Sequence, residues 1–334
     1  MKIFLILISF TFSVFSQENK PFSDSLYIES MNNKVSLKLD IDNDIESFKF
    51  LGENNSFLIT PNIDFKTGLS FNYRFISFKI SYAPNILSNN DNDLKGKTKI
   101  FKIQTDLYIK NWVQTLEYAK TKGYYASDFK SNNNQELPDD LKYLTIPDME
   151  TITYRGTTRY KFNPNFSFKA LTTQTEIQRK SAGSFAPGLT YKYREIKNKM
   201  TRQDLNTFSL VLNGGYYHTF VINHKWFSGF GVAPGFGMEF NKIIVKTDDF
   251  TTTDSDHDFV LNLDTTIGLG YNSKNLFGGA YLNFMATTRR DNEIIQFDTF
   301  RTHFQVFIGY RFKAPKFLKQ STDWIEEKSP VKKP

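Results

Sequence analysis

The sequence of 334 residues has no cysteine. This absence excludes disulfide scaffolds, zinc sites built from thiolates, cysteine nucleophiles and lipid attachment at a cysteine. Long apolar runs are also scarce, because no stretch after the first sixteen residues approaches the ~18 apolar residues that a membrane helix needs. A mean hydropathy of −0.44 is likewise too polar for a bundle of membrane helices. The chain is nevertheless too apolar and too weakly charged to be disordered.

Aromatic residues, in contrast, are abundant. The chain has 34 phenylalanines, 17 tyrosines and 3 tryptophans, which together make up 16% of its residues. A polar average combined with many aromatic side chains is typical of elements that have one polar and one apolar face. The length allows two domains, but all-β barrels of this size are often a single domain.

The N-terminus has the features of an export signal. Lys2 is followed by an apolar run from Ile3 to Ile8, and small residues precede Gln17. This pattern predicts a secretory signal peptide over residues 1–16 and export of the rest of the chain. The alternative is a short buried helix or strand at the N-terminus.

Most of the remaining chain alternates between apolar and polar residues. Between Asn62 and Phe75 the apolar residues recur with period 2, which predicts a strand, and the phase reverses after Phe75 and Ile76, which predicts a tight turn. Similar runs follow near residues 151–162, 185–194, 226–240 and 300–312. In the run 226–240 the other face carries mostly small residues, which is typical of a crowded interior.

Two all-β architectures fit this alternation. A soluble sandwich would turn its apolar faces inward, whereas an outer-membrane barrel turns them toward lipid and keeps charged residues inside. Several runs last 12 to 16 residues, which is longer than globular strands and long enough to cross a bilayer. Aromatic residues also gather at the predicted strand ends, as in Trp112 and Tyr310. We therefore predict a single antiparallel transmembrane β-barrel.

Tight connections at five places help to count the strands. They lie at Arg74–Ile76, Lys110–Trp112, Asn163–Phe166, Asn223–Trp226 and Asn272–Leu276, and longer polar connections lie near 84–97, 123–149, 241–257 and 290–297. The predicted strands are 62–75, 76–83, 98–109, 111–122, 150–162, 166–179, 184–195, 206–220, 225–240, 257–272, 275–289 and 298–312. We therefore expect about twelve strands, with a range of ten to fourteen.

The count leaves a problem of parity. If all five tight turns lie on one side, an even number of strands must separate neighbouring turns, yet three lie between Asn165 and Asn223. Either 184–195 belongs to a loop and a strand near 35–50 restores twelve, or one tight turn faces the other side. Residues 17–61 are then an N-terminal segment that is either a leader or the first strands, 62–312 form the barrel, and 313–334 form a basic tail rich in Pro and Lys.

In a barrel, the polar face of each strand points into the lumen. The predicted lumen-lining residues are Asp64, Lys66, Arg74, Lys79, Lys102, Asp106, Arg155, Arg159, Lys192, Arg194, Glu239, Asp264, Arg301 and Arg311. This set predicts an excess of positive charge in the lumen. In a narrow barrel such charges would pair across the interior and plug it, and in a wider barrel they would favour anions.

The sequence contains no strong catalytic or metal-binding motif. The four histidines lack the spacing of zinc ligands. The acidic run from Asp40 to Glu46 resembles a calcium loop, but Ile45 and Leu51 occupy the positions that require glycine and glutamate. We therefore expect no metal, no cofactor and no catalytic residue. An active site assembled from distant strands would leave no local motif, so the question of enzymatic activity stays open.

Several short motifs resemble a known family. Tyr27–Ser30, Thr60–Asn62, Gly96–Lys99, Lys122–Tyr125 and Lys180–Phe185 are similar to segments of the "domain of unknown function 4421" family of Bacteroidota. The resemblance spans about residues 24–314. It implies an outer-membrane β-barrel from a Gram-negative bacterium of that type, and it implies no catalytic residues.

Three functions follow as hypotheses. The first is an outer-membrane barrel with a structural role or a porin-like role as a small-solute channel. The second is an outer-membrane enzyme that acts on lipid or peptide, and the third is a secreted or periplasmic β-sandwich that binds a ligand. For the barrel, the expected partners are outer-membrane lipids, the barrel-assembly machinery and a small solute. Nucleic acid is not expected, because the basic residues are dispersed.

Overall fold

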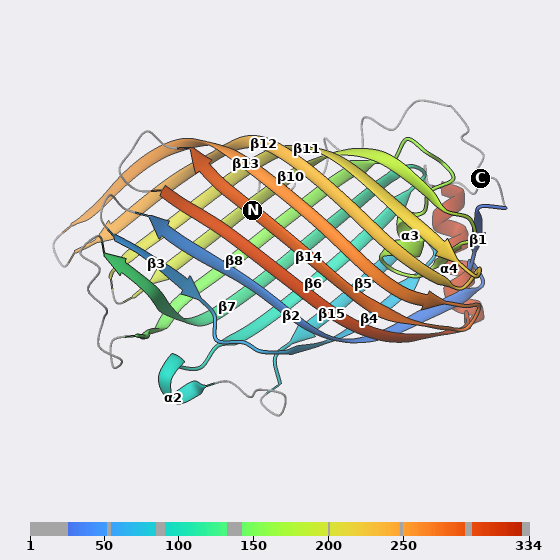
Figure 1. Ribbon diagram of the computed structural model, residues 1–334, viewed down its shortest axis with the longest axis horizontal. Coiled ribbons are helices and arrows are strands. Elements are labelled where there is room, and N and C mark those ends of the chain that lie inside the picture. Colours follow the sequence, from blue (N-terminus) through green and yellow to red (C-terminus); the bar gives the residue numbers. More distant parts are fainter. Residues whose placement is uncertain are drawn as a thin grey trace.

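The computed structural model of the chain describes residues 26–51, 55–84, 91–131, 142–199, 201–247, 250–290 and 296–328. Its main feature is one antiparallel β-barrel, shown in Figure 1. The predicted signal peptide, residues 1–16, lies outside the described residues.

Twelve strands close the ring of the barrel, and the last strand pairs with the first. Going round the ring, the strands are β2 (Lys34–Leu51), β4 (Lys66–Tyr73), β5 (Ile76–Tyr82), β6 (Lys99–Ile109), β7 (Trp112–Ser131), β8 (Leu144–Tyr160), β10 (Ala182–Asn198), β11 (Gln203–Ile222), β12 (Trp226–Lys246), β13 (Thr251–Asn272), β14 (Leu276–Arg290) and β15 (Gln296–Lys313). The predicted fold class, a single antiparallel barrel of about twelve strands, is confirmed.

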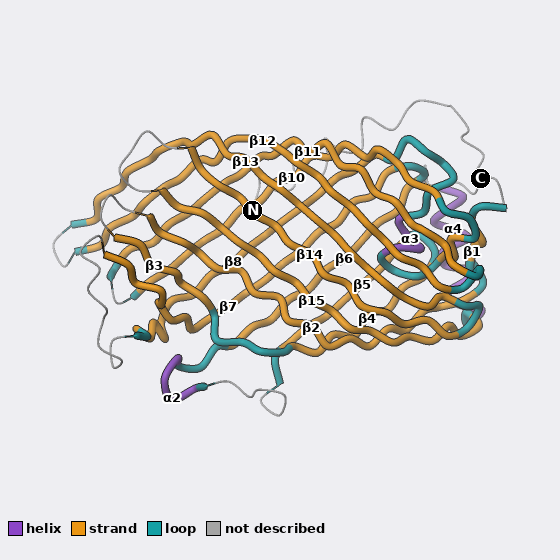
Figure 2. Tube along the Cα trace, in the orientation of Figure 1, coloured by secondary structure: helices purple, strands orange, loops and turns teal. Residues whose placement is uncertain are grey.

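The two ends of the barrel differ. At one end, which we call the turn end, the connections β4–β5, β6–β7, β11–β12 and β13–β14 have only two or three residues. The helix α4 (Lys316–Lys328) and the short helix α3 (Phe168–Leu171) also lie there, as Figure 2 shows. The other end, which we call the loop end, carries α2 (Asn92–Lys95) and the connections that follow β5, β7, β12 and β14.

The sheet of the barrel has a thirteenth strand, β3 (Asn55–Thr60). Near the loop end β3 takes the place of β4, β5 and β6 between β2 and β7. Toward the turn end, β2 pairs with β4 and β7 pairs with β6. Toward the loop end, both β2 and β7 pair with β3. Because one short strand stands where β4, β5 and β6 have ended, the ring is narrower at the loop end.

The outward face of the barrel is apolar. Phe65, Phe71 and Phe78 are 44%, 39% and 41% exposed, whereas Lys66, between the first two, is fully buried. Exposed leucine, isoleucine and phenylalanine side chains continue round the ring from β2 to β15. A sandwich would bury these aromatic faces, so the alternative of a secreted β-sandwich is wrong. The faces are those of a transmembrane barrel.

The parity problem has a simple answer. The predicted strand 166–179 is wrong, because that segment contains α3 and β9 (Glu176–Gln178), which do not join the ring. Residues 184–195 do form a strand, within β10, and β2 supplies the remaining strand near residues 35–50. The tight connection predicted at Asn163–Phe166 is therefore not a hairpin turn, and it leads into the lumen instead.

Strands at the loop end are longer than predicted. The connection predicted at 123–149 shrinks to the residues between Ser131 and Leu144, and the one predicted at 241–257 shrinks to those between Lys246 and Thr251. Their polar composition reflects strands that are exposed on both sides, such as the start of β13.

Aromatic residues gather on the outer surface of the turn end, as predicted. Rings pack in pairs there: Trp112 lies 4.9 Å from Tyr160 between ring centroids, and Trp226 lies 5.2 Å from Tyr271. Aromatic residues near other strand ends behave differently, because Tyr217 and Phe227 are buried inside the barrel in one apolar cluster. Tyr73 is also buried, although its cross-strand partner Ile76 is exposed on the outer face. No helix among the residues described is both long enough and apolar enough to span a membrane.

Candidate functional site

The turn end of the lumen is filled by the connection between β8 and β10. This connection holds α3 and β9, and β9 pairs with β1 (Ile28–Ser30). Phe168 and Leu171 of α3 are buried in one apolar cluster with inward side chains of the barrel. Figure 1 shows α3 within the outline of the barrel. We call β1, α3 and β9 the plug.

Local hydrogen bonds explain why this segment is not a strand. The Ser167 hydroxyl accepts a hydrogen bond from the Ala170 backbone N–H at 2.9 Å and so caps α3. The Thr172 hydroxyl donates to the Phe168 carbonyl at 2.8 Å. Because serine and threonine can satisfy nearby backbone groups in this way, they favour a short helical turn over a strand.

Side chains of the barrel wall donate hydrogen bonds to backbone carbonyl groups of the plug segment. The Tyr281 hydroxyl donates to the Leu171 carbonyl and accepts a hydrogen bond from Gln174 Nε2 at 3.2 Å. Arg311 donates from Nε to the Gln174 carbonyl at 2.8 Å and also donates to the Ser273 carbonyl. Arg311 therefore ties the plug to the β13–β14 turn.

Glycines on the inward face make room for the plug. A Cβ atom at Gly229 would lie 2.4 Å from Leu171 Cδ1, and one at Gly268 would lie 2.2 Å from Tyr281 Cε1. Both distances are too short for van der Waals contact. The small residues predicted to face a crowded lumen in β12 do so, because Gly229, Gly231 and Ala233 are buried.

The plug also carries ionisable groups. Burial alone would raise the pKa of Glu176, but Lys169 Nζ at 3.3 Å and the Ser167 hydroxyl, which donates at 2.5 Å, lower it below its ordinary value. Burial lowers the pKa of Lys161 from 10.5 to about 8, and attraction to Glu176 opposes this only in part. Lys161 donates to the Phe166 carbonyl at 2.6 Å, so its head group lies against the start of the plug.

Beyond the plug lies a chamber with a volume of about 280 Å³. Phe168, Leu171 and Thr172 of the plug segment line one end, and Glu117 and Arg301 line the other. Its wall also carries Lys38, Asp106, Arg159, Asp264 and His303. A cavity of this size with charged and polar side chains in its wall is suited to hold water.

The middle of the lumen is filled by ion pairs, which we call the ionic layer. Its acidic side is a stripe on β2, where Asp40, Asp42, Asp44 and Glu46 all face inward because they alternate along the strand. The contacts between this stripe and bases on neighbouring strands are Lys79–Asp40 at 2.6 Å, Lys79–Asp42 at 3.1 Å, Lys66–Asp42, Lys66–Asp44 at 3.4 Å, Lys102–Asp44 at 2.9 Å and Arg301–Asp44 at 2.7 Å.

Other ion pairs cross the interior. Arg301 on β15 contacts Glu117 on β7 at 3.1 Å, although β2, β4, β5 and β6 lie between these strands in the ring. Glu46 on β2 contacts Arg155 on β8 at 3.2 Å and also contacts Arg194 on β10, which lies opposite β2. Glu239 contacts Lys192 at 3.2 Å and Arg289 at 2.8 Å. The pairs of Arg301 and Glu46 join distant strands and therefore bridge the lumen, whereas the pairs of Glu239 on β12 span only one intervening strand on each side.

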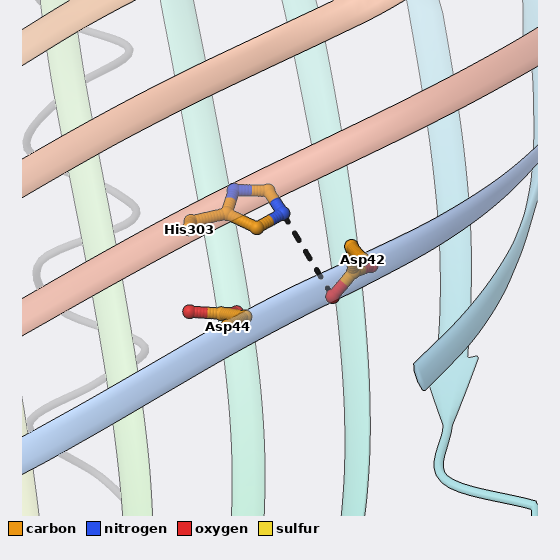
Figure 3. A group of neighbouring side chains, drawn as sticks. All are labelled: Asp42, Asp44 and His303. Carbon is orange, nitrogen blue, oxygen red and sulfur yellow. Dashed lines mark ion pairs between the residues drawn. The ribbon is translucent and has the colours of Figure 1, made fainter. Parts of the chain in front are cut away.

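Three residues of the layer have a geometry that could hold a metal ion. Ligand atoms of Asp42, Asp44 and His303 lie within 4.8 Å of one another, and Figure 3 shows the three side chains. His303 Nε2 is 3.8 Å from Asp42 Oδ1. The same two carboxylates already contact Lys66, Lys79, Lys102 and Arg301. A metal cation would therefore have to displace or repel these bases, and the donor set fits ion pairing better.

An apolar cluster fills the lumen at the loop end, and we call it the aromatic cluster. Its buried members are Phe48, Ile59, Tyr124, Ala126, Ile146, Met149 and Ile196, with Phe50, Phe57, Phe129 and Leu205 packed against them. The rings of Phe50 and Phe57 stack with centroids 4.7 Å apart. The Arg194 guanidinium lies 4.9 Å from the centroid of the Phe48 ring, so the cluster sits directly against the ionic layer.

A break in the alternation of β7 builds part of this cluster. The register of β7 against β8 shifts between Lys122 and Tyr124. Gly123 at the shift has a φ of 91°, and a Cβ atom there would lie 2.1 Å from the Lys97 carbonyl oxygen. Only glycine fits this position. After the shift Tyr124 and Ala126 face inward. Unbroken alternation would instead have turned Gly123 and Tyr125 inward.

The predicted lumen-lining residues lie almost entirely inside the barrel. Those on inward strand faces are Lys66, Lys79, Lys102, Asp106, Arg155, Arg159, Lys192, Arg194, Glu239, Asp264, Arg301 and Arg311, all buried or half-buried. Asp64 is half-buried in the connection before β4. Arg74 is different, because it lies in the β4–β5 turn and contacts Asp323 and Glu326 of α4. Its predicted position in the lumen is wrong.

Sequence reasoning missed the acids that matter most. The β2 stripe and Glu117 were not among the predicted residues, although Leu37, Leu39 and Ile41 alternate with the stripe and are exposed. That alternation was the available signal. These acids offset most of the bases of the ionic layer: the contacts given above join eight bases to six acids, so the positive excess is smaller than the predicted residues alone imply.

Comparison with known proteins identifies a family. The family model described as "Domain of unknown function (DUF4421)" matches residues 23–312. The outer membrane protease OmpT from Escherichia coli is similar in structure, with 8% identity, coverage of 85% of this chain and 98% of that chain, and a TM-score of 0.35.

Two further solved structures are similar at the same level. The KdgM porin in complex with disordered oligogalacturonate has 9% identity, coverage of 81% and 99%, and a TM-score of 0.30. A mutant of the TodX monoaromatic hydrocarbon channel has 8% identity, coverage of 85% and 91%, and a TM-score of 0.32. No curated protein matches the sequence. Likenesses this weak say nothing about the activity of this chain.

Proposed function

Since the chain belongs to the family described as "domain of unknown function 4421", we propose its function from its structure alone: it is an outer-membrane barrel with a structural role, closed at rest, and not a permanently open channel. The observation that supports this proposal best is the filling of the lumen at three levels, by the plug, the ionic layer and the aromatic cluster.

The apolar outer face supports the membrane location. Exposed apolar side chains surround the ring, and paired aromatic rings lie near the turn end. Such belts mark the membrane–water interfaces of outer-membrane barrels, whose short turns face the periplasm. The proposed partners are therefore outer-membrane lipids and, during export through a cleaved signal peptide, the barrel-assembly machinery.

The three fillings close the lumen by different means. Leu171 packs against the wall at the turn end, and the Arg301–Glu117 pair crosses the middle at 3.1 Å. Phe48 is almost fully buried at the loop end. Conduction would require all three to move. Desolvated ion pairs that lose one partner leave an unpaired charge, which is costly, so the closed state is strongly favoured.

A gated small-solute channel is the second candidate, and the chamber favours it. The chamber of about 280 Å³ already provides a space inside the barrel, and charged side chains lie in its wall. The plug that bounds it is part of a connection between strands and not a strand of the ring. A solute would pass only after the plug and the ionic layer rearranged.

Planar-bilayer recording tests the proposal. The full chain, refolded and checked by heat-modifiable migration in detergent, is added to a planar lipid bilayer under low and high voltage. We expect no steady conductance, because the lumen is filled. A steady, ohmic conductance from the folded protein would contradict a closed resting state, whereas brief openings that depend on voltage would favour the gated channel.

A further inference from the structure

The helix α4 at the turn end has its polar side against the barrel and its apolar side exposed. Thr322 and Glu326 are buried, whereas Phe317 and Trp324 are 69% and 59% exposed and Ile325 is 38% exposed. This arrangement is the reverse of an ordinary helix that packs on a protein core. The exposed apolar side therefore needs an explanation.

An arginine of the barrel holds the polar side. Arg74, in the β4–β5 turn, donates from Nη1 to Asp323 Oδ1 at 2.8 Å and to Glu326 Oε2 at 3.0 Å. Its Nε donates to the Asn32 carbonyl at 3.2 Å. Burial alone would lower the pKa of Arg74, but the two carboxylates raise it above its ordinary value. The contacts of Arg74 with Asp323 and Glu326 therefore fix which side of α4 faces the barrel.

The remaining surface of α4 divides into two sectors. Successive helical residues are about 100° apart, so Phe317 and Trp324, seven residues apart, share one side with Ile325 next to them. We call these three residues the apolar sector. Lys316, Lys319 and Glu327 are polar and exposed on the other side, and of these Lys319 lies farthest round the helix from Trp324. Gln320, Ser321 and Lys328 are exposed polar residues that flank Phe317 and Trp324. The helix thus has a barrel side, an apolar side and a water side.

The apolar sector continues the outward belt of the barrel. Only Ala314 and Pro315 separate α4 from β15, whose Tyr310 and Phe312 are exposed and pack with ring centroids 4.9 Å apart. Ile76, two residues after Arg74, is also exposed on the outer face. Figure 1 shows α4 running across the long axis of the barrel, which is the direction of the membrane plane if the barrel crosses a bilayer.

We propose that α4 lies in the lipid–water interface at the turn end, with Phe317, Trp324 and Ile325 inserted among the acyl chains of a glycerophospholipid bilayer. The inference rests on the proposed membrane location of the barrel. Helices with an apolar side and a lysine-rich polar side lie in such interfaces, and tryptophan is enriched there. A protein partner in place of lipid is an outcome of the test below.

Tryptophan fluorescence in brominated lipid tests the proposal. In the full-length W112F/W226F variant, Trp324 is the only remaining tryptophan. The variant is folded into vesicles of phosphatidylcholine, with or without bromine on the acyl chains. We expect bromine to remove most of the Trp324 emission and acrylamide, a quencher dissolved in water, to remove little. A Trp324 that acrylamide quenches and bromine does not would overturn the proposal, and would leave the sector free for a protein partner.

Two matched variants make the result specific. In the W112F/W226F/W324F background, Lys319→Trp places the only tryptophan on the water side, about 140° round the helix from position 324, where we expect acrylamide to quench it and bromine to have little effect. Equal bromine quenching at both positions would also overturn the proposal, because it would mean that α4 has no defined water side.

A variant that keeps only Trp226 reports on the barrel itself. If bromine quenches Trp226 but not Trp324, α4 alone is misplaced; if it quenches neither, the membrane location of the barrel is wrong.

Discussion

The plug and the ionic layer close the same lumen by different interactions. The plug is held by apolar packing of Phe168 and Leu171 and by hydrogen bonds to its backbone carbonyls, such as that from Tyr281 to Leu171. The ionic layer is held by charges on opposite walls, such as Arg301 and Glu117. Apolar packing weakens gradually as groups are removed, whereas a buried charge that loses its partner is left uncompensated. The two regions should therefore respond differently to the same kind of mutation.

The largest effect is expected in the ionic layer. Asp44 contacts Lys66, Lys102 and Arg301, so Asp44→Ala leaves three buried cations with less compensation. We expect a loss of about 3–5 kcal/mol in the free energy of unfolding, measured by urea unfolding of the protein in lipid vesicles. The control is Asp204→Ala, which removes a partly exposed pair with Lys246 and should cost about 0–1 kcal/mol. Equal losses in the two variants would show that the layer does not depend on pairing.

A smaller effect is expected in the plug. Leu171→Ala removes a buried side chain from the cluster at the turn end and should cost about 2–3 kcal/mol, because the plug can relax around the cavity. The loss should appear as faster hydrogen exchange in residues 167–178, while the barrel strands keep their protection. Leu94→Ala in α2, where the leucine is exposed, serves as the control and should change stability by less than about 0.5 kcal/mol. Faster exchange throughout the strands of Leu171→Ala would mean that the plug and the barrel unfold together.

The fit between plug and wall can be tested from the wall. A methyl group at Gly268 would collide with the Tyr281 ring, whose hydroxyl holds the Leu171 carbonyl. Gly268→Ala should therefore cost about 1–3 kcal/mol and increase hydrogen exchange in the plug. At Gly214 the nearest atom to an added Cβ is 3.9 Å away, so Gly214→Ala is the matched control and should be nearly neutral. Protection of the plug that is unchanged by Gly268→Ala would contradict the proposed contact.

The smallest effect is expected from pH. The pKa of Lys161 is lowered to about 8 in the folded protein, so the unfolded chain binds more protons than the folded chain between about pH 8 and pH 10.5. Stability should therefore rise with pH in this window. We expect a gain of about 1 kcal/mol in the protection of the plug, because the long side chain can turn partly toward water. The measurement is hydrogen exchange corrected for its intrinsic pH dependence, and Lys161→Met should remove the gain. A decrease in protection over the same window would contradict this assignment.

Some features could be predicted from the sequence because they depend on neighbouring residues. Period-2 alternation identified the long strands, and the turns after Tyr73, Ile109, Ile222 and Asn272 were found at the right places. Alternation failed where a local feature interrupted it. Gly123 shifts the register of β7, and hydrogen bonds from Ser167 and Thr172 fold α3 where a strand was expected.

The sequence by itself therefore determined the fold class, the outward apolar face and the inward direction of most charged residues, because side-chain direction follows from position along a strand. Only the tertiary structure decided which charges meet. Glu46 and Arg194 are 148 residues apart in the chain, and they pair because closure of the ring places β2 opposite β10. The filling of the lumen was likewise decided by closure, because a loop can become a plug only when a ring of strands surrounds it.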